Sequence, residues 1–320
     1  MLTRRRIAAL CGTAAAFAAA STARAAWPER AVTLIVAFPP GGSTDVAART
    51  LARFLERDLG QPVVVLNRAR AGGEVGWGEL ARARPDGHTI GFINTPNIVT
   101  IPIERQARYR LEDFAPVANV VDDPGAFFVP ADGPHRTLGE LVAFARANPE
   151  RVTYGTTGIG SDDHLAALAF QRLAGVRLTH VPFAGASQVR NAVLGRQIAL
   201  ASMNMGEGIA DARQGQLRAL GQMGERRWEE APDVPTFREQ GVDVVQGSMR
   251  GLAAPAGTPP EVLQRLAAAV RWTMEDAEFR QLASQQALPL RFLGPDAYRA
   301  ELLVMHEDFR RLWAAHPWKE

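Results

Sequence analysis

The sequence predicts an α/β protein of two lobes, each a mainly parallel sheet flanked by helices. Short apolar runs rich in β-branched residues alternate with longer segments in which apolar residues recur at helical spacing. Strands that alternate with helices along a chain form parallel sheets. About 295 residues follow the N-terminal segment described below, which is long for one hydrophobic core and comfortable for two.

The first 25 residues have the features of a cleaved export signal. Three arginines at 4–6 precede an uncharged stretch at 7–20, and small residues around 23–25 form a cleavage site. The uncharged stretch is too short to span a bilayer. The arginine run fits both an ordinary and a twin-arginine signal, so the export route stays open. We expect a mature protein outside the cytoplasm that begins after Ala25.

The single cysteine and the charge balance both change when this signal is removed. Cys11 lies inside the signal, and the preceding Leu10 is larger than a lipid-attachment site accepts, so we expect no lipid anchor. A mature chain without a thiol has no disulfide, thiolate metal site or cysteine nucleophile. Cleavage also removes four arginines, which leaves 32 basic against 34 acidic residues and a formal charge of −2. The charge therefore gives no indication of a nucleic-acid partner.

A glycine-rich turn at 38–45 organises the first lobe. It follows an apolar strand at 32–38 and opens a helix with Ala48, Leu51, Leu55 and Leu59 at helical spacing. The two prolines favour an extended backbone, and the two glycines can adopt backbone conformations that other residues rarely adopt. Ser43, Thr44 or Asp45 can cap the helix. Backbone N–H groups at the positive end of a helix suit a carboxylate, sulfate or phosphate. The candidate ligand residues here are Pro40, Gly41, Gly42, Ser43, Thr44 and Asp45; a tight connection that binds nothing is the alternative.

Further candidates follow later strands. Predicted strands at 63–66 and 89–93 place Asn94 and Thr95 at a carboxyl end, where ligands of parallel sheets gather. Two short strand-like runs at 117–121 and 127–129, divided by a turn at 122–125, suggest a crossing into the second lobe. The predicted division is 26–122 for the first lobe, 123–246 for the second, and 247–320 for a return to the first.

The second lobe repeats the pattern of strand, glycine turn and helix. After a strand at 152–155, the turn offers Thr157, Gly158, Ile159, Gly160 and Ser161 as candidate ligand residues, and the helix that follows adds His164. A small-residue loop adds Phe183, Ala184 and Gly185, and Asn204 ends a later strand. We expect the helix starts of the two lobes to face one cleft.

Ser161 and His164 allow two interpretations. A hydrolase would use Ser161 as nucleophile and His164 as base, but no orienting acid or oxyanion arrangement is identifiable. We favour Ser161 as an N-cap that accepts from the backbone N–H of His164. Asp162 and Asp163, with His164, could hold a metal, although consecutive acids at a helix start more often complement the dipole at the surface. The chain has no phosphate loop or dinucleotide fingerprint, and we expect no metal and no cofactor.

Eight segments in the same order resemble one family. The chain is similar to the Bug/TctC family of periplasmic solute-binding proteins, the receptors of tripartite tricarboxylate transporters. The similarity covers essentially all of the mature chain. The segments are Trp27 to Val32, the turn Phe38 to Asp45, Pro85-Asp86-Gly87, Asp113 to Val117, Gly158 to Leu165, His180 to Gly185, Val234-Pro235-Thr236 and Ala254 to Pro259.

The resemblance implies a two-lobed type II periplasmic binding protein fold with the ligand clamped between the lobes. It further implies a small carboxylic acid as ligand, held through backbone groups and ordered waters, and membrane transporter subunits as partners. On the positions of this chain, the ligand loops become 40–45, 157–161 and 183–185. We expect a monomeric periplasmic receptor and not an enzyme. A periplasmic sensor with a membrane signalling partner is the alternative.

Four positions depart from the family pattern. Usual acids are replaced by Ala192, Ala199 and Met203, and a usual lysine by Ala184. If any of these acids faces the cleft in relatives, an amine-bearing ligand is less expected here than a simple carboxylate. The sequence does not identify the acid, its length or whether it is aromatic.

Overall fold

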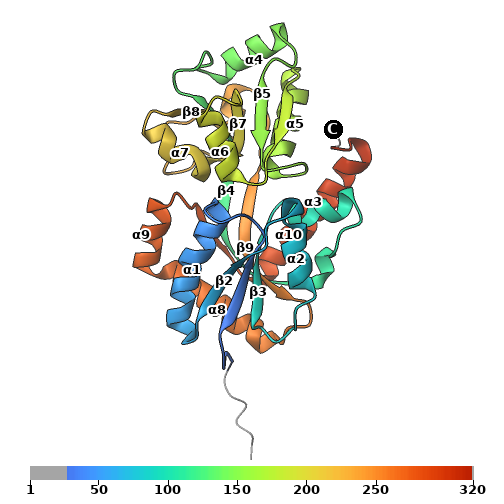
Figure 1. The fold of residues 1–320 in the computed structure, drawn as a ribbon, viewed down its shortest axis with the longest axis vertical. Helices are drawn as coiled ribbons and strands as arrows, with labels where there is room; N and C mark the ends of the chain where they lie inside the picture. Colours follow the sequence, from blue (N-terminus) through green and yellow to red (C-terminus); the bar gives the residue numbers. More distant parts are fainter. Residues whose placement is uncertain (1–26, 319–320) are drawn as a thin grey trace, which may run out of the picture.

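The computed structural model describes residues 27–318. Figure 1 shows two lobes, one above the other, with strands β4 and β9 passing between them. The strand order is β2-β1-β3-β9-β4-β7-β5-β6, and β8 and β10 pair with β4 outside this path. Among the described residues, no helix combines the length and the apolar composition needed to cross a bilayer.

The first lobe has a parallel core of three strands. β1 pairs in parallel with β2 and β3, and β3 pairs antiparallel with β9. These strands and the helices between them follow the alternation that predicted an α/β fold, which is confirmed. The elements are β1 (Val32–Val36), α1 (Ser43–Leu59), β2 (Val63–Asn67), η1 (Ala71–Gly73), α2 (Glu74–Ala81), β3 (Thr89–Asn94), α3 (Asn97–Glu104) and η2 (Leu111–Asp113).

The second lobe repeats this arrangement at smaller size. β5 pairs in parallel with β6 and β7, and β7 and β8 pair antiparallel with β4. Ser161 caps α5, as the sequence predicts, and Thr137 caps α4. The elements are α4 (Leu138–Ala147), β5 (Thr153–Thr156), α5 (Asp162–Ala174), β6 (Thr179–Pro182), α6 (Ala186–Leu194), β7 (Leu200–Asn204), α7 (Met205–Arg213), β8 (Leu217–Gln222) and η3 (Arg238–Gln240).

Two strands connect the lobes: β4 (Phe114–Pro130) and β9 (Gly247–Pro255). The prediction of two short strands divided by a turn at 122–125 is wrong, because β4 is continuous. Its turn-forming residues find partners on both sides. Asp122 N donates to Pro289 O at 2.9 Å, and Gly125 N donates to Gln246 O at 2.8 Å. The predicted lobe boundaries lie within β4 and at the start of β9, and they stay predictions.

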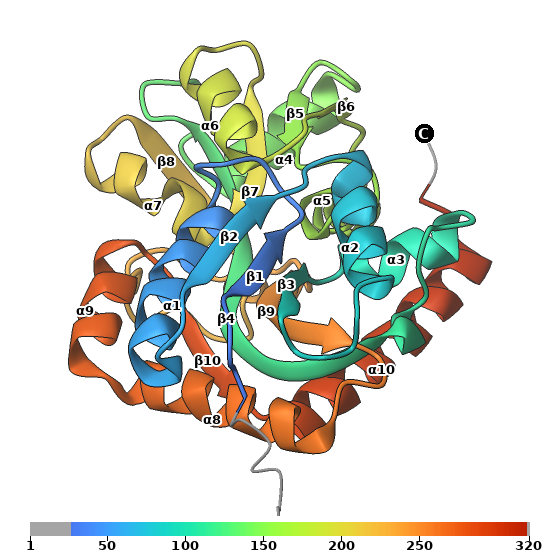
Figure 2. The same cartoon turned by 60° about the horizontal axis from the view of Figure 1, so that its bottom comes forward.

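The C-terminal segment returns to the first lobe. Its helices pack around the lower sheet in Figure 2. α8 lies against α1, and α10 lies against α3 and β4. The elements are α8 (Pro260–Glu275), α9 (Ala277–Gln285), β10 (Leu290–Leu293) and α10 (Pro295–Ala315).

The first helix begins differently from the prediction. Its N-cap is Gly42, without a side-chain hydrogen bond, so none of the three predicted polar residues caps it. Asp45 instead accepts from Gly41 N at 3.0 Å, from Arg49 at 2.9 Å and from Asn67 at 2.8 Å. The carboxylate therefore stabilises the turn and leaves the first N–H groups of α1 unused.

Candidate ligand-binding cleft

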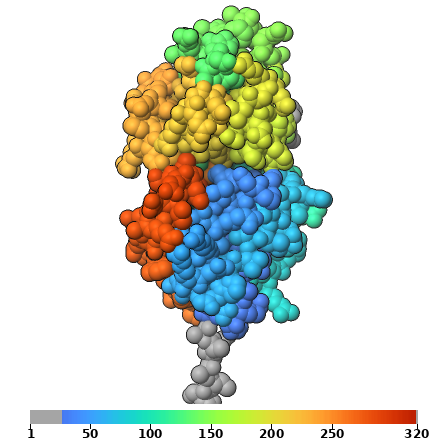
Figure 3. All heavy atoms as spheres, turned by 60° about the vertical axis from the view of Figure 1, so that its left-hand side comes forward, coloured from blue at the N-terminus to red at the C-terminus, as the bar shows by residue number. Residues whose placement is uncertain are grey.

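A narrow cleft lies where the two lobes meet, at the waist of the molecule in Figure 3. Both lobes and the crossing strand β9 contribute to its wall. The lobes also meet directly: Thr100 Oγ1 donates to Gly160 O at 2.9 Å, and Gly185 lies so near Pro39 that an added Cβ would be 3.3 Å from Pro39 Cδ. The lining residues are Phe38, Pro39, Gly42, Ser43, Thr44, Asn94, Asn97, Thr157, Asp162, Gly185, Ala186, Ser187, Asn204, Glu207, Ser248 and Arg250.

On the first-lobe side, the cleft meets the start of α1. The backbone N–H groups of Ser43 and Thr44 belong to the first helical turn, where no intrahelical acceptor exists. The hydrogen bonds among the described residues give them no other acceptor. Asn94, from the end of β3, donates through Nδ2 to Thr44 Oγ1 at 2.7 Å. This side therefore presents two N–H donors at the positive end of a helix dipole.

Asp45 lies behind this turn, outside the cleft lining. Burial would raise the pKa of its carboxyl, but the hydrogen bonds from Arg49, Gly41 and Asn67 outweigh burial and lower the pKa. Asp45 is thus an ionised support for the turn. Pro40 and Gly41 also lie outside the lining.

On the second-lobe side, the start of α5 is occupied by its own acids. Asp163 Oδ2 accepts from Thr157 N at 3.1 Å and from Thr157 Oγ1 at 2.6 Å. Asp162 Oδ2 accepts from Asn204 Nδ2 at 2.7 Å. The open helix start on this side is that of α6, where Ala186 and Ser187 have first-turn N–H groups without an acceptor among the described residues. We expected α5 to supply these donors, and the structure places α6 there instead.

The rest of the loop before α5, residues 158–161, lies outside the cleft lining. Ser161 Oγ donates to Gly158 O at 2.8 Å and accepts from His164 N at 3.2 Å. His164 Nδ1 accepts from Gly160 N at 3.2 Å, and its ring stacks on His180 at 4.4 Å between centroids. Burial, and then the nearby His180, lower the pKa of His164 to about 3. The imidazole thus bonds the backbone and not the Ser161 hydroxyl, which gives the hydrolase alternative no support.

The other predicted residues fall into two groups. Seven line the cleft: Gly42, Ser43, Thr44, Asn94, Thr157, Gly185 and Asn204. Most of the rest shape the backbone around it; Thr95, for example, accepts from Met249 N at 2.8 Å and ties β3 to β9. The residues outside the lining are Pro40, Gly41, Asp45, Thr95, Gly158, Ile159, Gly160, Ser161, His164, Phe183 and Ala184.

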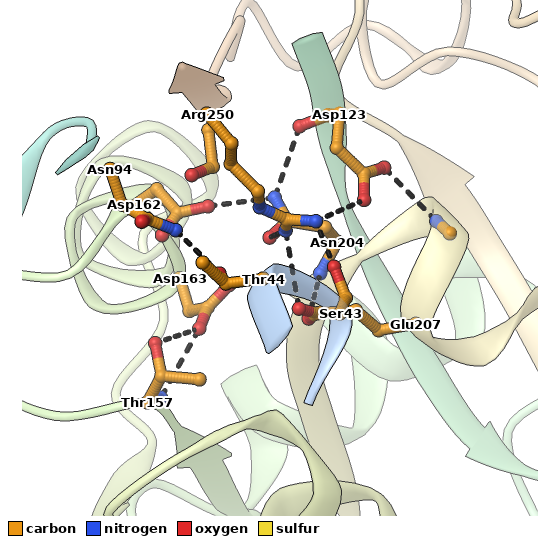
Figure 4. A network of polar contacts seen from close by, with 12 residues as sticks. Ser43, Thr44, Asn94, Asp123, Thr157, Asp162, Asp163, Asn204, Glu207 and Arg250 are labelled. Atoms are coloured by element: carbon orange, nitrogen blue, oxygen red, sulfur yellow. Dashed lines mark hydrogen bonds and ion pairs between the residues drawn. The ribbon is translucent and has the colours of Figure 1, made fainter. Parts of the chain in front are cut away.

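Arg250, on β9, is the largest feature that the sequence did not reveal. It is buried, and its guanidinium joins both lobes (Figure 4). Nη1 contacts Ser43 Oγ and lies 3.2 Å from Asp123 Oδ2. Nη2 donates to Asn204 Oδ1 at 2.6 Å and to Glu207 Oε1 at 3.2 Å. The only indication in the sequence was that Arg250 is a single charged residue within an otherwise apolar strand.

Glu207 had a clearer signal, because it follows Asn204 by three residues in a capping-box pattern that the structure forms. Phe38, Pro39, Ala186 and Ser187 are direct neighbours of predicted loops. Asn97 and Ser248 carried no signal.

Four acids surround Arg250. Burial raises the pKa of Asp123 to about 7, with Arg250 opposing the rise and Glu207 adding to it. Burial also raises the pKa of Asp162 to about 6, and that of Asp163 well above its usual range. The expectation that Asp162 and Asp163 lie at the surface is wrong, because both are buried. Among the described residues, no group of three His, Cys, Asp or Glu side chains is arranged to hold a metal.

The four positions that depart from the family pattern lie away from the cleft wall. Ala192 and Met203 are buried in the second-lobe core, and neither Ala199 nor Ala184 lines the cleft. The loss of acids at these positions therefore carries no argument against an amine-bearing ligand.

Comparisons with known proteins relate this chain to one family. A family model described as "Tripartite tricarboxylate transporter family receptor" matches residues 47–291. Protein BugT of Bordetella pertussis is 34% identical over 278 residues, covering 85% of this chain and 85% of BugT. The solved periplasmic binding protein BugD has a TM-score of 0.85 and 29% identity, covering 92% of this chain and 99% of its own. MatC from Rhodopseudomonas palustris with bound malate has a TM-score of 0.79 and 27% identity, covering 91% and 98%.

The predicted periplasmic binding protein fold is confirmed by these solved structures. The family model covers most of the chain, and BugT supports it at the level of sequence. The chain belongs to the tripartite tricarboxylate transporter receptor family, the TctC/Bug family of periplasmic solute-binding proteins.

Proposed function

We propose that this protein is an extracytoplasmic receptor that captures a small carboxylic acid between its lobes and delivers it to the membrane subunits of a tripartite tricarboxylate-type transporter. One observation carries the proposal: the starts of α1 and α6, one from each lobe, line the same cleft with unused backbone N–H groups. Helix N-termini bind anions through such groups. The bound malate of MatC supports a carboxylate as the ligand.

The ligand residues that we propose are those at the two helix starts, together with polar side chains at strand ends. Ser43, Thr44, Ala186 and Ser187 supply N–H donors. A carboxylate that accepts from both lobes stabilises the closed arrangement over the open one, because only the closed arrangement brings both sets of donors to it. Asn94, Thr157 and Asn204 complete the polar wall.

Binding of the ligand is tested first by a thermal-shift screen of the mature protein against mono- and dicarboxylates, followed by calorimetry of the acids that raise the unfolding temperature. We expect at least one small acid to bind with a one-to-one stoichiometry. A screen in which no carboxylate binds, with the protein folded, contradicts the proposal.

The partner and the location are tested separately. Deletion of the gene should abolish uptake of the identified acid, and a plasmid copy should restore it. Unchanged uptake contradicts the transport role and leaves the sensor alternative. N-terminal sequencing of the protein from a periplasmic extract should begin after Ala25; recovery of the full-length chain in the cytoplasm alone contradicts export.

A further inference from the structure

The two lobes also meet outside the cleft lining, at the loop 158–161 that precedes α5. Thr100 Oγ1, on α3 of the first lobe, donates to Gly160 O at 2.9 Å. Glu104, one turn further along α3, and Trp318, which follows α10, also come close to this glycine. None of these four residues lines the cleft. The contact therefore joins the lobes without involving the helix starts that we propose for the ligand.

Trp318 is fixed to the first lobe by its side chain. The residue is 2% exposed, although it lies beyond the last turn of α10. Its Nε1 donates to Glu104 Oε2 at 3.2 Å, and its ring meets Trp313 edge-on at 4.6 Å and Phe309 at 6.0 Å between centroids. Edge-to-face aromatic pairs add to the free energy of burial. α10 packs along α3, and its end points toward the second lobe in Figure 1.

Gly160 fits against these side chains so closely that the position has no room for a side chain of its own. An added Cβ would lie 3.0 Å from Glu104 Oε2, 3.2 Å from Trp318 Nε1 and 3.5 Å from Thr100 Oγ1. Its φ of +72° also favours glycine. Both reasons for a glycine at this position concern the contact between the lobes, and neither concerns a ligand.

On its other side, Gly160 is bound to the second lobe. Gly160 N donates to His164 Nδ1 at 3.2 Å. Ser161 Oγ accepts from His164 N at 3.2 Å and donates to Gly158 O at 2.8 Å. Because these bonds fix the loop to the start of α5, a displacement of the second lobe moves Gly160 with it.

We propose that Thr100, Glu104 and Trp318 form an interlobe latch that holds Gly160 and stabilises the arrangement in which the starts of α1 and α6 line one cleft. The latch consists only of residues of this chain, so it acts with and without a ligand. Its role in ligand retention rests on the proposed function. Since the ligand binds to that arrangement, its apparent Kd rises when the fraction of protein in the arrangement falls. Loss of the latch should act chiefly on the dissociation rate.

Two variants remove the latch by different chemistry. Thr100→Val deletes the hydroxyl that binds Gly160 O and keeps nearly the same shape, and Trp318→Ala deletes the indole. The matched control is Thr50→Val, which deletes a buried hydroxyl and its 2.7 Å bond to Gln286 Oε1 within the first lobe.

Scattering tests the latch without any ligand. In small-angle X-ray scattering of the free mature proteins, we expect a larger radius of gyration for Thr100→Val and Trp318→Ala than for wild type and Thr50→Val. Saturation with the carboxylic acid that gives the largest thermal shift in the screen should restore the wild-type value. Far-UV circular dichroism checks that each variant is folded, and Thr100→Val decides the test if Trp318→Ala is not.

Stopped-flow tryptophan fluorescence with the same acid tests ligand retention. Each latch variant should release the acid at least about fivefold faster than wild type, the change expected from one lost buried hydrogen bond. The association rate should stay within about twofold, because encounter with the ligand does not use the latch. Thr50→Val should leave both rates unchanged.

The possible failures are distinguishable. A radius of gyration and a dissociation rate that both stay at wild-type values in the latch variants overturn this inference and leave the proposed function standing. Equal changes in Thr50→Val also overturn it, because a general loss of stability would then explain them. If no carboxylate binds, the proposed function fails, and scattering alone decides whether the latch exists.

Discussion

Arg250 Nη1 lies 3.2 Å from Asp123 Oδ2, and these two residues come from β9 and β4, the strands that pass between the lobes. Both side chains are buried, and in the pairing of β4 with β9 Arg250 lies opposite Val121, two residues before Asp123. The ion pair therefore joins the two connecting strands where they pass between the lobes. Its bonds to Ser43 and Asn204 extend it into each lobe.

Arg250→Ala should destabilise the protein by about 3–5 kcal/mol, because it leaves Asp123 and Glu207 buried without their cation. Urea unfolding measures this change. The control is Arg291→Ala, which breaks half-exposed pairs with Asp122 and Glu301 and should cost less than about 1 kcal/mol. Equal losses in the two variants contradict the role assigned to Arg250.

Asp163→Asn should gain stability relative to the wild type as the pH rises. Burial, and then the charges of Asp162 and Glu207, raise the pKa of Asp163 above that of the unfolded chain. The folded wild type therefore holds a proton that the unfolded state has released, so this contribution to stability is lost as pH increases above about 4. Asparagine avoids this loss.

Thermal unfolding of both proteins at about pH 5 and about pH 8 checks the sign: the stability of Asp163→Asn relative to wild type should be greater at the higher pH. Asp132→Asn, in an exposed pair with Arg196, is the control and should show no such trend. A difference between Asp163→Asn and wild type that shrinks with pH contradicts the prediction.

Ser161→Ala should lower the free energy of unfolding by about 1 kcal/mol, because it removes the cap on His164 N. Thr137→Ala, which removes the equivalent cap on Glu140 N of α4, gives a matched comparison. Ligand affinity should stay within about twofold, since Ser161 lies outside the cleft lining. A variant as stable as wild type would show that the serine has another role.

Gly185→Val should weaken ligand binding by more than about tenfold with the fold intact. A Cβ at Gly185 would lie 3.3 Å from Pro39 Cδ, so a valine holds the lobes apart and covers the start of α6. The backbone there is extended, which any residue adopts. Calorimetry with the acid found by screening measures the loss. Gly139→Ala on α4 is the control: its added Cβ meets nothing closer than 3.9 Å, so its ligand affinity should equal that of wild type. An affinity of Gly185→Val equal to that of Gly139→Ala would contradict the proposed clash with Pro39.

Local signals in the sequence predicted the frame of the molecule well. Alternating strands and helices, the cap at Ser161 and the glycine turn at 38–45 all depend on residues close together in the chain. The continuity of β4 depends on partners far away, Pro289 and Gln246, so turn-forming residues misled the prediction there.

The site was predicted less completely, for the same reason. Ser43, Thr44 and Asn94 follow strand ends, and the structure places these three predicted residues in the cleft lining. Arg250 and Asp162 enter the cleft through contacts with residues more than 40 positions away, and no local pattern marks them. The open helix start in the second lobe is that of α6, because the buried side chains of Asp162 and Asp163 occupy the start of α5. Their burial could not be read from the sequence.

The central claim, that backbone N–H groups at the start of α1 hold the ligand's carboxylate, is tested most directly at Ser43. Proline fits the first position of a helix and has no N–H, so Ser43→Pro removes one donor with the helix intact. Ser43→Ala is the matched control, because it loses the same hydroxyl and keeps the N–H. Calorimetry with the acid found by screening should show Ser43→Pro binding at least about tenfold more weakly than Ser43→Ala. Equal affinities in the two variants, with both folded, would contradict the account.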